Sequence, residues 1–170
     1  MDIECSGNKS IPFKRSNVME GEVRDMMNSI TGWVDASMIY GSDEEVGNRL
    51  REFTLGRMKQ GNGKMLPLQV GNAHRLNDAG DIRVNENILL TSFHTIFVRE
   101  HNRIAKVIVT KNPRLSDEEI YQAAKNYVTG LIQKITYEEF LPILLGRKAY
   151  NQYIGPYKNY DTEINPTLEI

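Results

Sequence analysis

Two consecutive amphipathic segments constrain the fold of this 170-residue chain most strongly. Between residues 85 and 111, apolar side chains recur at spacings of three and four, the period of an α-helix with one apolar face. A second such segment begins at Ser116, and Glu119 three residues later completes the pattern of a helix capping box. We expect the two helices to pack as a pair, the second ending near Pro142 and Gly146. The two apolar stripes are Leu89, Phe93, Ile96, Phe97, Ile104, Val107 and Ile108, and Ile120, Ala124, Tyr127, Val128, Leu131 and Ile135.

The rest of the chain predicts short helices and loops. Residues 1–20 show no periodicity and are interpreted as an extended lead-in, and residues 22–30 predict a short helix. Ser42, followed by acidic residues, predicts another helix start with a serine cap. Five glycines and a proline across residues 54–80 predict a long loop, which in a compact domain is either functional or disordered. The predicted fold class is therefore mainly α, with long loops between helices and no defensible strand.

Composition excludes several classes of protein. The net charge is −1, so nothing favours nucleic acid or an anionic membrane surface as a partner, and no apolar run reaches the roughly 20 residues of a membrane helix. Cys5 is the only cysteine, which rules out an internal disulfide framework and a cysteine-based zinc site. A lone cysteine favours a reducing compartment, whereas Asn8-Lys9-Ser10 is a glycosylation acceptor pattern typical of secreted proteins. Composition alone leaves the compartment open.

Oxygen-bearing side chains alternate in the run that begins at Thr31. In an extended segment Thr31, Asp35 and Ser37 would point the same way. Together with the backbone carbonyl of Trp33, they could hold a hard cation such as calcium. Calcium takes about six to eight oxygen ligands, so a further carboxylate would have to come from elsewhere. The same spacing also fits an Asx or Ser/Thr turn that binds no metal.

Arg83 and Glu86 stand three residues apart at the start of the first predicted long helix. A guanidinium and a carboxylate in these positions can face one ligand together. The alternative is that they stabilise the helix dipole and pair with each other.

Three polar residues fall on the first long helix itself. His94 and His101 are seven residues apart and share one helix face, a spacing unsuited to a metal pair, so both are interpreted as partly buried structural histidines. Glu100 falls inside the apolar stripe, and a buried carboxylate must be paired or neutral. We therefore expect Glu100 to form an ion pair with an arginine elsewhere in the core.

Three blocks of the sequence resemble the animal-type haem peroxidases of the peroxidase–cyclooxygenase superfamily. The run from Trp33 to Ser42 resembles the calcium loop of that family, and residues 83–103 resemble its distal-arginine helix. Residues 135–142 resemble a third block, in the long helix that follows. The blocks stand in the order of the family, and the resemblance covers about residue 11 to the C-terminus. A plain helical scaffold without a cofactor would require all three blocks to coincide by chance.

The resemblance implies the central, helical part of a haem peroxidase domain with haem b and calcium as cofactors. Arg83 would be the distal arginine, which stabilises the negative charge that develops as the O–O bond of peroxide breaks. Glu86 would form an ester with a haem methyl group. The substrates implied are hydrogen peroxide and small electron donors such as halides or phenols, with a role in the response to oxidative stress and a secreted or extracellular location. The implied calcium ligands are Thr31, Trp33, Asp35 and Ser37.

The sequence also departs from the family pattern. Asn87 stands where one mammalian member has a haem-linked methionine, so a sulfonium link is excluded. None of the three histidines matches the distal or the proximal histidine of the family. We therefore expect residues 21–170 to be a domain part without those two segments, with little activity on its own. A non-enzymatic adhesion or extracellular-matrix module on the same scaffold is the alternative.

Overall fold

The computed structural model of the chain describes residues 18, 27–28, 30–71, 75–158, 161 and 163. These residues form helices and loops, without a β-strand, so the predicted mainly α fold class is confirmed. The predicted lead-in over residues 1–20 and the predicted helix over residues 22–30 lie almost entirely outside the described residues. In chain order the elements are α1 (Ser37–Tyr40), α2 (Glu44–Leu50), the 3₁₀ turns η1 (Asn62–Lys64) and η2 (Ile82–Asn85), α3 (Ile88–Lys111), α4 (Asp117–Lys134), the π-helical segment η3 (Ile135–Phe140), α5 (Leu141–Leu145) and α6 (Arg147–Tyr153).

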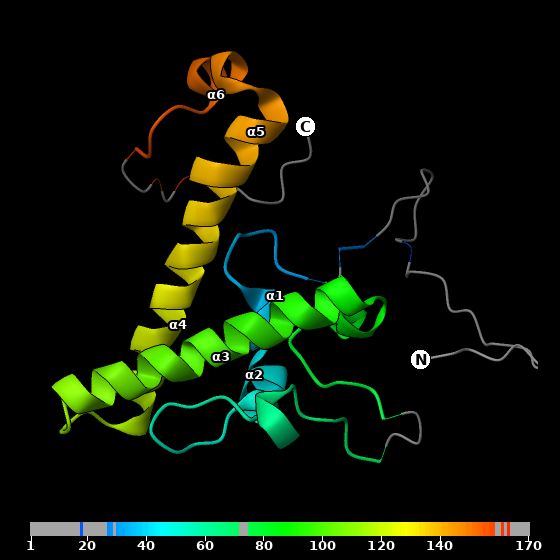
Figure 1. Cartoon of the computed structure of the whole chain (residues 1–170), viewed down its shortest axis with the longest axis vertical. Helices are drawn as coiled ribbons and strands as arrows, with labels where there is room; N and C mark the ends of the chain where they lie inside the picture. Colours follow the sequence, from blue (N-terminus) through cyan, green and yellow to red (C-terminus); the bar gives the residue numbers. More distant parts are fainter. Residues whose placement is uncertain are drawn as a thin grey trace, which may run out of the picture.

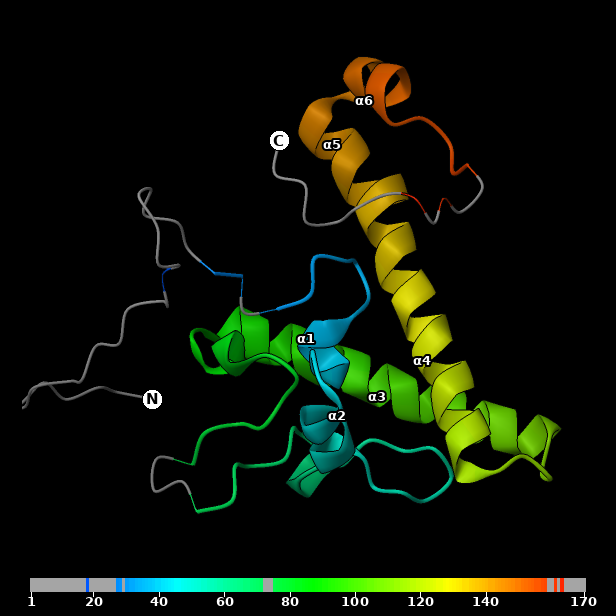
Figure 2. The same ribbon diagram turned by 180° about the vertical axis from the view of Figure 1, so that it is seen from behind.

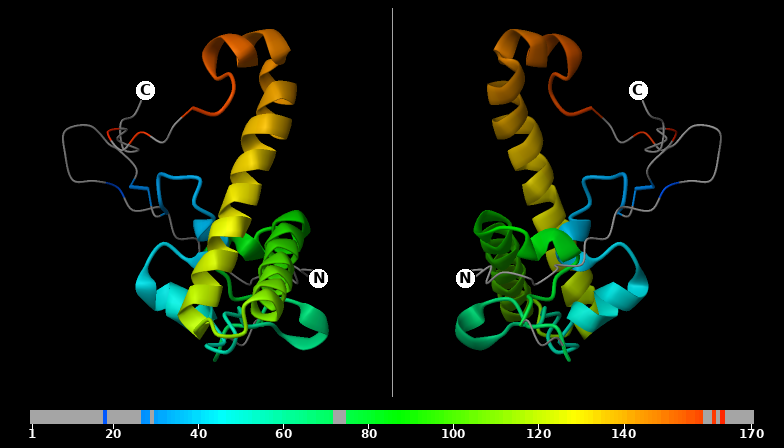
Figure 3. Two further views of the ribbon diagram at one scale, coloured as in Figure 1. Left: turned by 90° about the vertical axis from the view of Figure 1, so that its left-hand side faces the viewer. Right: turned by 90° about the vertical axis from the view of Figure 1, so that its right-hand side faces the viewer.

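The long helices α3 and α4 pack against each other, as the sequence predicts. They cross near the end of α3, and α4 then continues as an arm that leads into α5 and α6 (Figure 1). The short helices α1 and α2 lie along the flank of α3 in both opposite views (Figures 1 and 2). Seen along α3, the α4 arm rises away from this body (Figure 3). The main buried core lies where α1, α2, α3 and α4 meet.

Helix α3 begins three residues later than the sequence predicts. The side chain of Asn87 accepts hydrogen bonds from the backbone N–H groups of Leu89 and Leu90, both at 3.0 Å, and so caps the helix. Arg83 and Glu86 therefore lie before α3, in and just after the turn η2. The cap gives Asn87 a local structural role at this position.

Helix α4 begins with the capping box that the sequence predicts. The Ser116 hydroxyl accepts from the backbone N–H of Glu119, and the Glu119 carboxylate accepts from the backbone N–H of Ser116. The helical path continues through Pro142 and breaks at Gly146. Of the predicted buried face, Ile120, Ala124 and Val128 are buried, whereas Tyr127 is exposed; Tyr121 and Ile132 complete the buried face instead.

The segment between α2 and η2 is tied down although it has little regular structure. The cap of α2 is Asp43, whose carboxylate accepts from the backbone N–H of Val46, so the predicted serine cap at Ser42 is wrong by one residue. Further on, the Asn102 side chain both donates to and accepts from the backbone of Met58, at 2.9 and 2.8 Å. These two bonds fasten the loop to α3.

The predicted apolar stripe of α3 is wrong over the first half of the helix. Leu89, Phe93 and Ile96 are each more than half exposed. The helix carries apolar residues on two faces, and α1 and α4 cover the face on which polar residues alternate with apolar ones. The buried residues of α3 are His94, Thr95, Val98, His101, Ile104 and Ala105.

The polar residues of α3 also differ from the prediction. Both His94 and His101 are fully buried, where the sequence predicts partial burial. Glu100 pairs with Arg103 one turn further along the same helix, at 2.7 Å, and this hydrogen bonding lowers the pKa of the Glu100 carboxyl. The predicted ion pair with an arginine elsewhere in the core is therefore wrong.

Gly80 permits the close approach of α1 to the segment that carries Arg83. A Cβ atom at Gly80 would lie 2.2 Å from the carbonyl oxygen of Ser37 and 2.4 Å from the backbone nitrogen of Gly41. Both contacts are to backbone atoms, which cannot turn aside as a flexible side chain could. A residue with a side chain at position 80 would therefore push α1 away.

Replacing Gly80 by alanine is expected to destabilise the fold by about 3 kcal/mol, because α1 must shift and the core around it loses contacts. Urea denaturation of both proteins measures the change. The matched control is Gly130→Ala: Gly130 lies on α4 with nothing within 4 Å of an added Cβ, so this change should stabilise by roughly 0.5–1 kcal/mol. Equal effects of the two substitutions would contradict the close approach at Gly80.

Candidate functional site

One cavity brings most of the predicted site residues together. It has a volume of about 420 Å³ and lies between the loop before α1, the turn η2 and the two long helices. Trp33 and Asp35 line it from the loop, Ser37 lines it from the start of α1, and Arg83 and Glu86 line it from η2 and the residue after it. Of the predicted set, Thr31 alone is outside the lining, but it bonds two residues that belong to it. The remaining lining includes Asp81, Leu90, His94, Ile132 and Thr136.

The Arg83 side chain is oriented by Asp81. The carboxylate of Asp81 accepts from Nε of Arg83 at 3.0 Å and from Nη2 at 2.5 Å, and it also accepts from the backbone N–H of Arg83 at 2.9 Å. Asp81 is 7% exposed and fixed in place, whereas the arginine side chain is 54% exposed. Nη1 of Arg83 forms no hydrogen bond within the described part of the chain. One edge of the guanidinium is therefore held, and the other is available to a ligand.

The interaction between Asp81 and Arg83 also determines the ionisation state of both side chains at the cavity. Hydrogen bonding from Arg83 lowers the pKa of the Asp81 carboxyl, against the opposing effect of burial. The same bond raises the pKa of the Arg83 guanidinium, with a smaller contribution from the charge of Glu86. Both residues thus stay ionised across the physiological range.

Glu86 lies beside this pair, directly before the cap of α3. Its side chain is exposed, and its carboxylate makes no hydrogen bond or ion pair within the described residues. The alternative that Arg83 and Glu86 pair with each other is therefore not seen among those residues, because the guanidinium pairs with Asp81 instead. A carboxylate without a partner at a cavity wall is free to contact or react with a bound group.

The side chains of Thr31, Asp35 and Ser37 converge on one point. The Thr31 hydroxyl donates to Oδ1 of Asp35 at 2.9 Å and lies 2.9 Å from Oγ of Ser37. The backbone N–H of Ser37 also donates to the Asp35 carboxylate at 2.9 Å, which makes an Asx turn. The segment bends here, with Ala36 at a φ of 62°, instead of being extended as the sequence argument assumes. The convergence that the spacing predicts is nonetheless present.

His94 lines the cavity from α3. Its Nδ1 lies 2.7 Å from the carbonyl oxygen of Leu90, so this nitrogen carries a proton and donates. Its Nε2 is buried and has no hydrogen-bond partner in the described part of the chain. The sequence predicts His94 only as a structural histidine, so its position in the cavity lining was not predicted.

Asp81 is a site residue that sequence reasoning missed. A signal for it exists, because an aspartate directly before a short helical turn commonly accepts from backbone N–H groups within that turn. Asp81 caps η2 in this way, and the same geometry brings its second oxygen to the guanidinium of Arg83.

Among solved structures, this fold is similar to peroxidase A from Dictyostelium discoideum. The TM-score is 0.63 at 29% sequence identity, covering 81% of this chain and 32% of that one. A fatty acid α-dioxygenase from Oryza sativa is also similar, with a TM-score of 0.64 at 26% identity over 82% of this chain and 25% of the other. Both matches extend over most of the helical body.

Comparison of sequences places the chain in a family. Residues 2–169 match the pattern of the animal haem peroxidases, and the chain belongs to that family. It is 38% identical to mouse eosinophil peroxidase over 93% of its length and 37% identical to human myeloperoxidase over 86%. A Caenorhabditis elegans peroxidasin homologue, pxn-2, is 37% identical over 85% of this chain. The chain spans 25%, 22% and 12% of the lengths of these three relatives.

Membrane-spanning helices and clusters of acidic, histidine or cysteine side chains suited to a metal are both absent from the described residues. None of the helices there is long and apolar enough to cross a membrane. Those residues also contain no cluster of three or more histidine, cysteine, aspartate or glutamate side chains able to hold a metal ion. The oxygen cluster around Asp35 has a single carboxylate, and its other side-chain oxygens are the hydroxyls of Thr31 and Ser37.

Asp81→Asn tests the anchoring of Arg83. At pH 7 the substitution should destabilise the protein by about 2 kcal/mol, because a charge-assisted hydrogen bond to a buried carboxylate is lost. The pKa of Asp81 is lowered from 3.8 in the folded state, so its contribution is present above that pH and is lost as the pH falls below it. Urea midpoints measured from pH 7 downwards should therefore converge for the two proteins in acid. A stability difference that is independent of pH would contradict this role.

Proposed function

We propose that this chain supplies the distal-arginine wall of a haem-dependent peroxidase, an enzyme that reduces hydrogen peroxide and oxidises small donors. The observation that carries the proposal is that Arg83 is held by buried Asp81 and lines a cavity that Glu86 also lines. Membership of the animal haem peroxidase family supports it. Halides and phenols are the donor classes that we expect, with a role in the response to oxidative stress.

The residues of the cavity are suited to haem. Glu86 presents a carboxylate without a partner among the described residues, as a residue that forms an ester with a haem methyl must. Leu90 and Ile132 supply apolar surface beside it. Haem, when bound, supplies the iron at which the O–O bond of peroxide is cleaved. We propose haem b, ester-linked through Glu86.

Arg83 would stabilise the negative charge that develops on oxygen during the reaction. Cleavage of a peroxide bond places negative charge on oxygen, and a preorganised cation stabilises that charge without having to reorient. Asp81 fixes the guanidinium before the substrate arrives, and the raised pKa of Arg83 keeps it cationic. Removal of one such preorganised group typically lowers a rate by about a hundred- to a thousandfold.

We propose calcium as the second cofactor, held by Thr31, Asp35 and Ser37 with the carbonyl oxygen of Trp33. Three converging hard oxygen atoms suit calcium, and the hydrogen bonds among them show that they can approach one point. The loop supplies fewer than the roughly six to eight oxygens that calcium takes, so further ligands would come from outside it. We infer an extracellular location, where calcium is abundant.

We further propose that residues 21–170 form the central part of a larger peroxidase domain. Exposed apolar side chains support this: Leu89, Phe93 and Ile96 form an outward face on α3, and Phe140, Ile143 and Leu144 are exposed on the arm. Contiguous apolar surface of this kind is rare on soluble monomers. Segments that carry the proximal iron ligand and the general base would cover these faces.

In the complete haem-loaded peroxidase domain, of which this chain would be the central part, Arg83→Leu is expected to slow the reaction with hydrogen peroxide by about a hundred- to a thousandfold. Stopped-flow absorbance of the haem measures that rate directly. The control is Arg99→Leu, which removes the same charge from α3 where the arginine bonds the backbone carbonyls of Gly63 and Lys64. Equal rates for the wild type and the Arg83 variant would exclude the proposed role.

A non-enzymatic adhesion or matrix module on the same scaffold is the second candidate function. The similarity to a peroxidasin homologue, over a small share of that longer protein, favours keeping it. Mass spectrometry of the natural protein separates the two. Haem attached to the peptide that contains Glu86 supports the enzyme, whereas an unmodified peptide from a protein without bound haem supports the module.

The cation site is testable without haem. Terbium(III) mimics calcium, and Trp33, the only tryptophan, is suitably placed to sensitise its luminescence. Asp35→Asn should weaken terbium binding by about tenfold or more, because the only carboxylate of the cluster is lost. Ser92→Ala is the control, since the Ser92 hydroxyl bonds its own helix at Ile88. Unchanged affinity in Asp35→Asn would argue for the metal-free Asx turn.

A further inference from the structure

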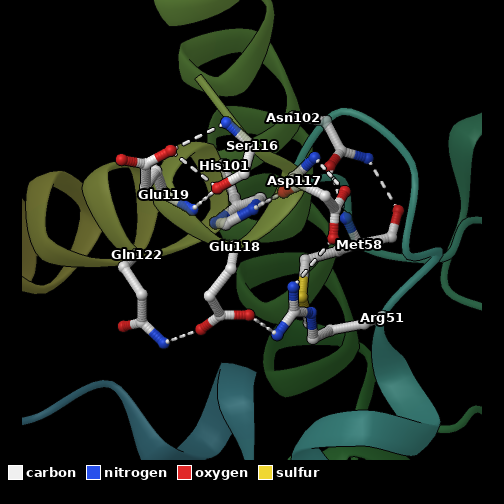
Figure 4. A network of polar contacts seen from close by, with 10 residues as sticks. Arg51, Met58, His101, Asn102, Ser116, Asp117, Glu118, Glu119 and Gln122 are labelled. Atoms are coloured by element: carbon white, nitrogen blue, oxygen red, sulfur yellow. Dashed lines mark hydrogen bonds and ion pairs between the residues drawn. The ribbon is translucent and has the colours of Figure 1, made fainter. Parts of the chain in front are cut away.

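His101 joins three segments of the chain at the centre of the core. The residue is 0% exposed and lies on α3. Its Nδ1 is 2.8 Å from the hydroxyl of Tyr40 at the end of α1, and its Nε2 is 2.8 Å from the carbonyl oxygen of Gly56. The ring also contacts the rings of Tyr40 and Tyr121, with centroids 5.4 Å away in both cases. Figure 4 shows His101 on α3 beside the ion pairs of Arg51.

The two partners determine which nitrogen of His101 carries the proton. A carbonyl oxygen only accepts, so Nε2 must be the donor to Gly56. Nδ1 of the neutral ring then accepts, and the Tyr40 hydroxyl donates to it. Burial raises the pKa of Tyr40, which therefore remains a protonated donor. In the neutral state every polar atom of this group is satisfied.

A second proton on His101 would break this arrangement. Nδ1 would become a donor, and the Tyr40 hydroxyl would have to accept from it. The hydrogen of that buried hydroxyl would then lose its partner, which is costly in a site that water does not reach. The imidazolium itself would also be buried without a counter-ion in contact.

The surrounding charges do not favour an imidazolium. The charge of Arg51, at the end of α2, acts on His101, and Asp117 and Glu118 of α4 are already paired with this arginine. From α4, Tyr121 faces the ring and the Lys125 ammonium lies over the ring of Tyr40. Burial chiefly, and Arg51 in addition, lower the pKa of His101 to about 4, although the hydrogen bond to Gly56 acts in the opposite sense.

The contact at Tyr40 is connected to the cavity through α1. This helix is a single turn, from Ser37 at the cavity to Tyr40 at His101. The backbone of α1 and its C-cap Gly41 also approaches Gly80, the residue before Asp81, too closely to admit a Cβ atom there. Helix α1 is thus held between His101 and the segment that orients Arg83.

We propose that His101 is a positioning residue: its neutral ring clamps Tyr40, keeps α1 seated against Gly80, and opens when acid adds a second proton. This contact positions α1, which lines the cavity, and it consists of protein groups alone. The proposal is therefore separate from the peroxidase function and does not require haem. It keeps the oxygen cluster at Ser37 in register with Arg83. Acidification releases α1 and separates these two walls.

Hydrogen exchange of the full 170-residue chain, as a function of pH, tests the clamp. Burial lowers the pKa of His101 to about 4, below the 6.5 of an ordinary imidazole, so an opening that exposes the ring should become easier by up to tenfold per pH unit between these values. Protection factors for residues 37–41, corrected for intrinsic rates, should fall accordingly from pH 7 to pH 4.5. A fall that this segment does not share, or protection that stays constant, overturns the proposal.

Two variants test whether the pH dependence of hydrogen exchange in residues 37–41 arises from His101. His101→Asn keeps an acceptor near the Nδ1 position for Tyr40 but does not titrate, so protection of residues 37–41 should lose most of its pH dependence. The matched control is His94→Asn, which removes the other buried histidine of α3 but leaves the contact with α1 intact. This variant should retain the wild-type pH dependence. The same fall in His101→Asn as in the wild type would contradict the clamp.

A measurement on the wild type keeps the proposal testable if the Asn variant does not fold. Nitrogen-15 chemical shifts of the imidazole distinguish its tautomers. At pH 7 the shifts should show Nδ1 unprotonated and Nε2 protonated, because Gly56 can only accept. The opposite tautomer, or a doubly protonated ring at that pH, overturns the proposal.

Discussion

The close approach of α1 to Gly80 is the constraint on which the site depends. The two backbones meet so tightly that a Cβ atom at position 80 would lie 2.2 Å from the carbonyl oxygen of Ser37. Ser37 ends the oxygen-rich loop, and Asp81 follows Gly80 directly. One contact between backbones therefore places the oxygen cluster at Asp35 and an anchored arginine on the same cavity, although they lie more than forty residues apart in the chain.

The helices could be predicted because their causes are local. The capping box at Ser116 and the period of the apolar residues act within a few turns of chain, and α3 and α4 form and pair as these patterns predict. Which face of α3 is covered is not a local property. Leu89 and Phe93 satisfy the helical period, yet α1 and α4 pack on the face that contains His94 and His101. Periodicity identifies an apolar face but not its partner.

The site, too, has features that local sequence patterns predict and features that they do not. The spacing of Thr31, Asp35 and Ser37 predicts their convergence, which the structure shows, although it is reached through a bend at Ala36 instead of an extended strand. Their binding of calcium, and the catalytic role of Arg83, stay predictions. The partner of Arg83 lies only two residues away, within reach of local sequence patterns, whereas the bond between His101 and Tyr40 spans 61 positions of the sequence. No pattern in a single sequence reveals a contact of that kind.

The arrangement as a whole makes the loop at Asp35 and the guanidinium of Arg83 two walls of one site. Paramagnetic NMR tests this most directly: gadolinium(III) added to the chain should occupy the oxygen cluster and broaden nearby resonances. The account predicts strong broadening of the Nε–H signal of Arg83, with a much weaker effect on that of Arg99, which bonds the η1 turn. Equal broadening of the two arginines, or a sharp Arg83 signal at saturating gadolinium, would contradict it.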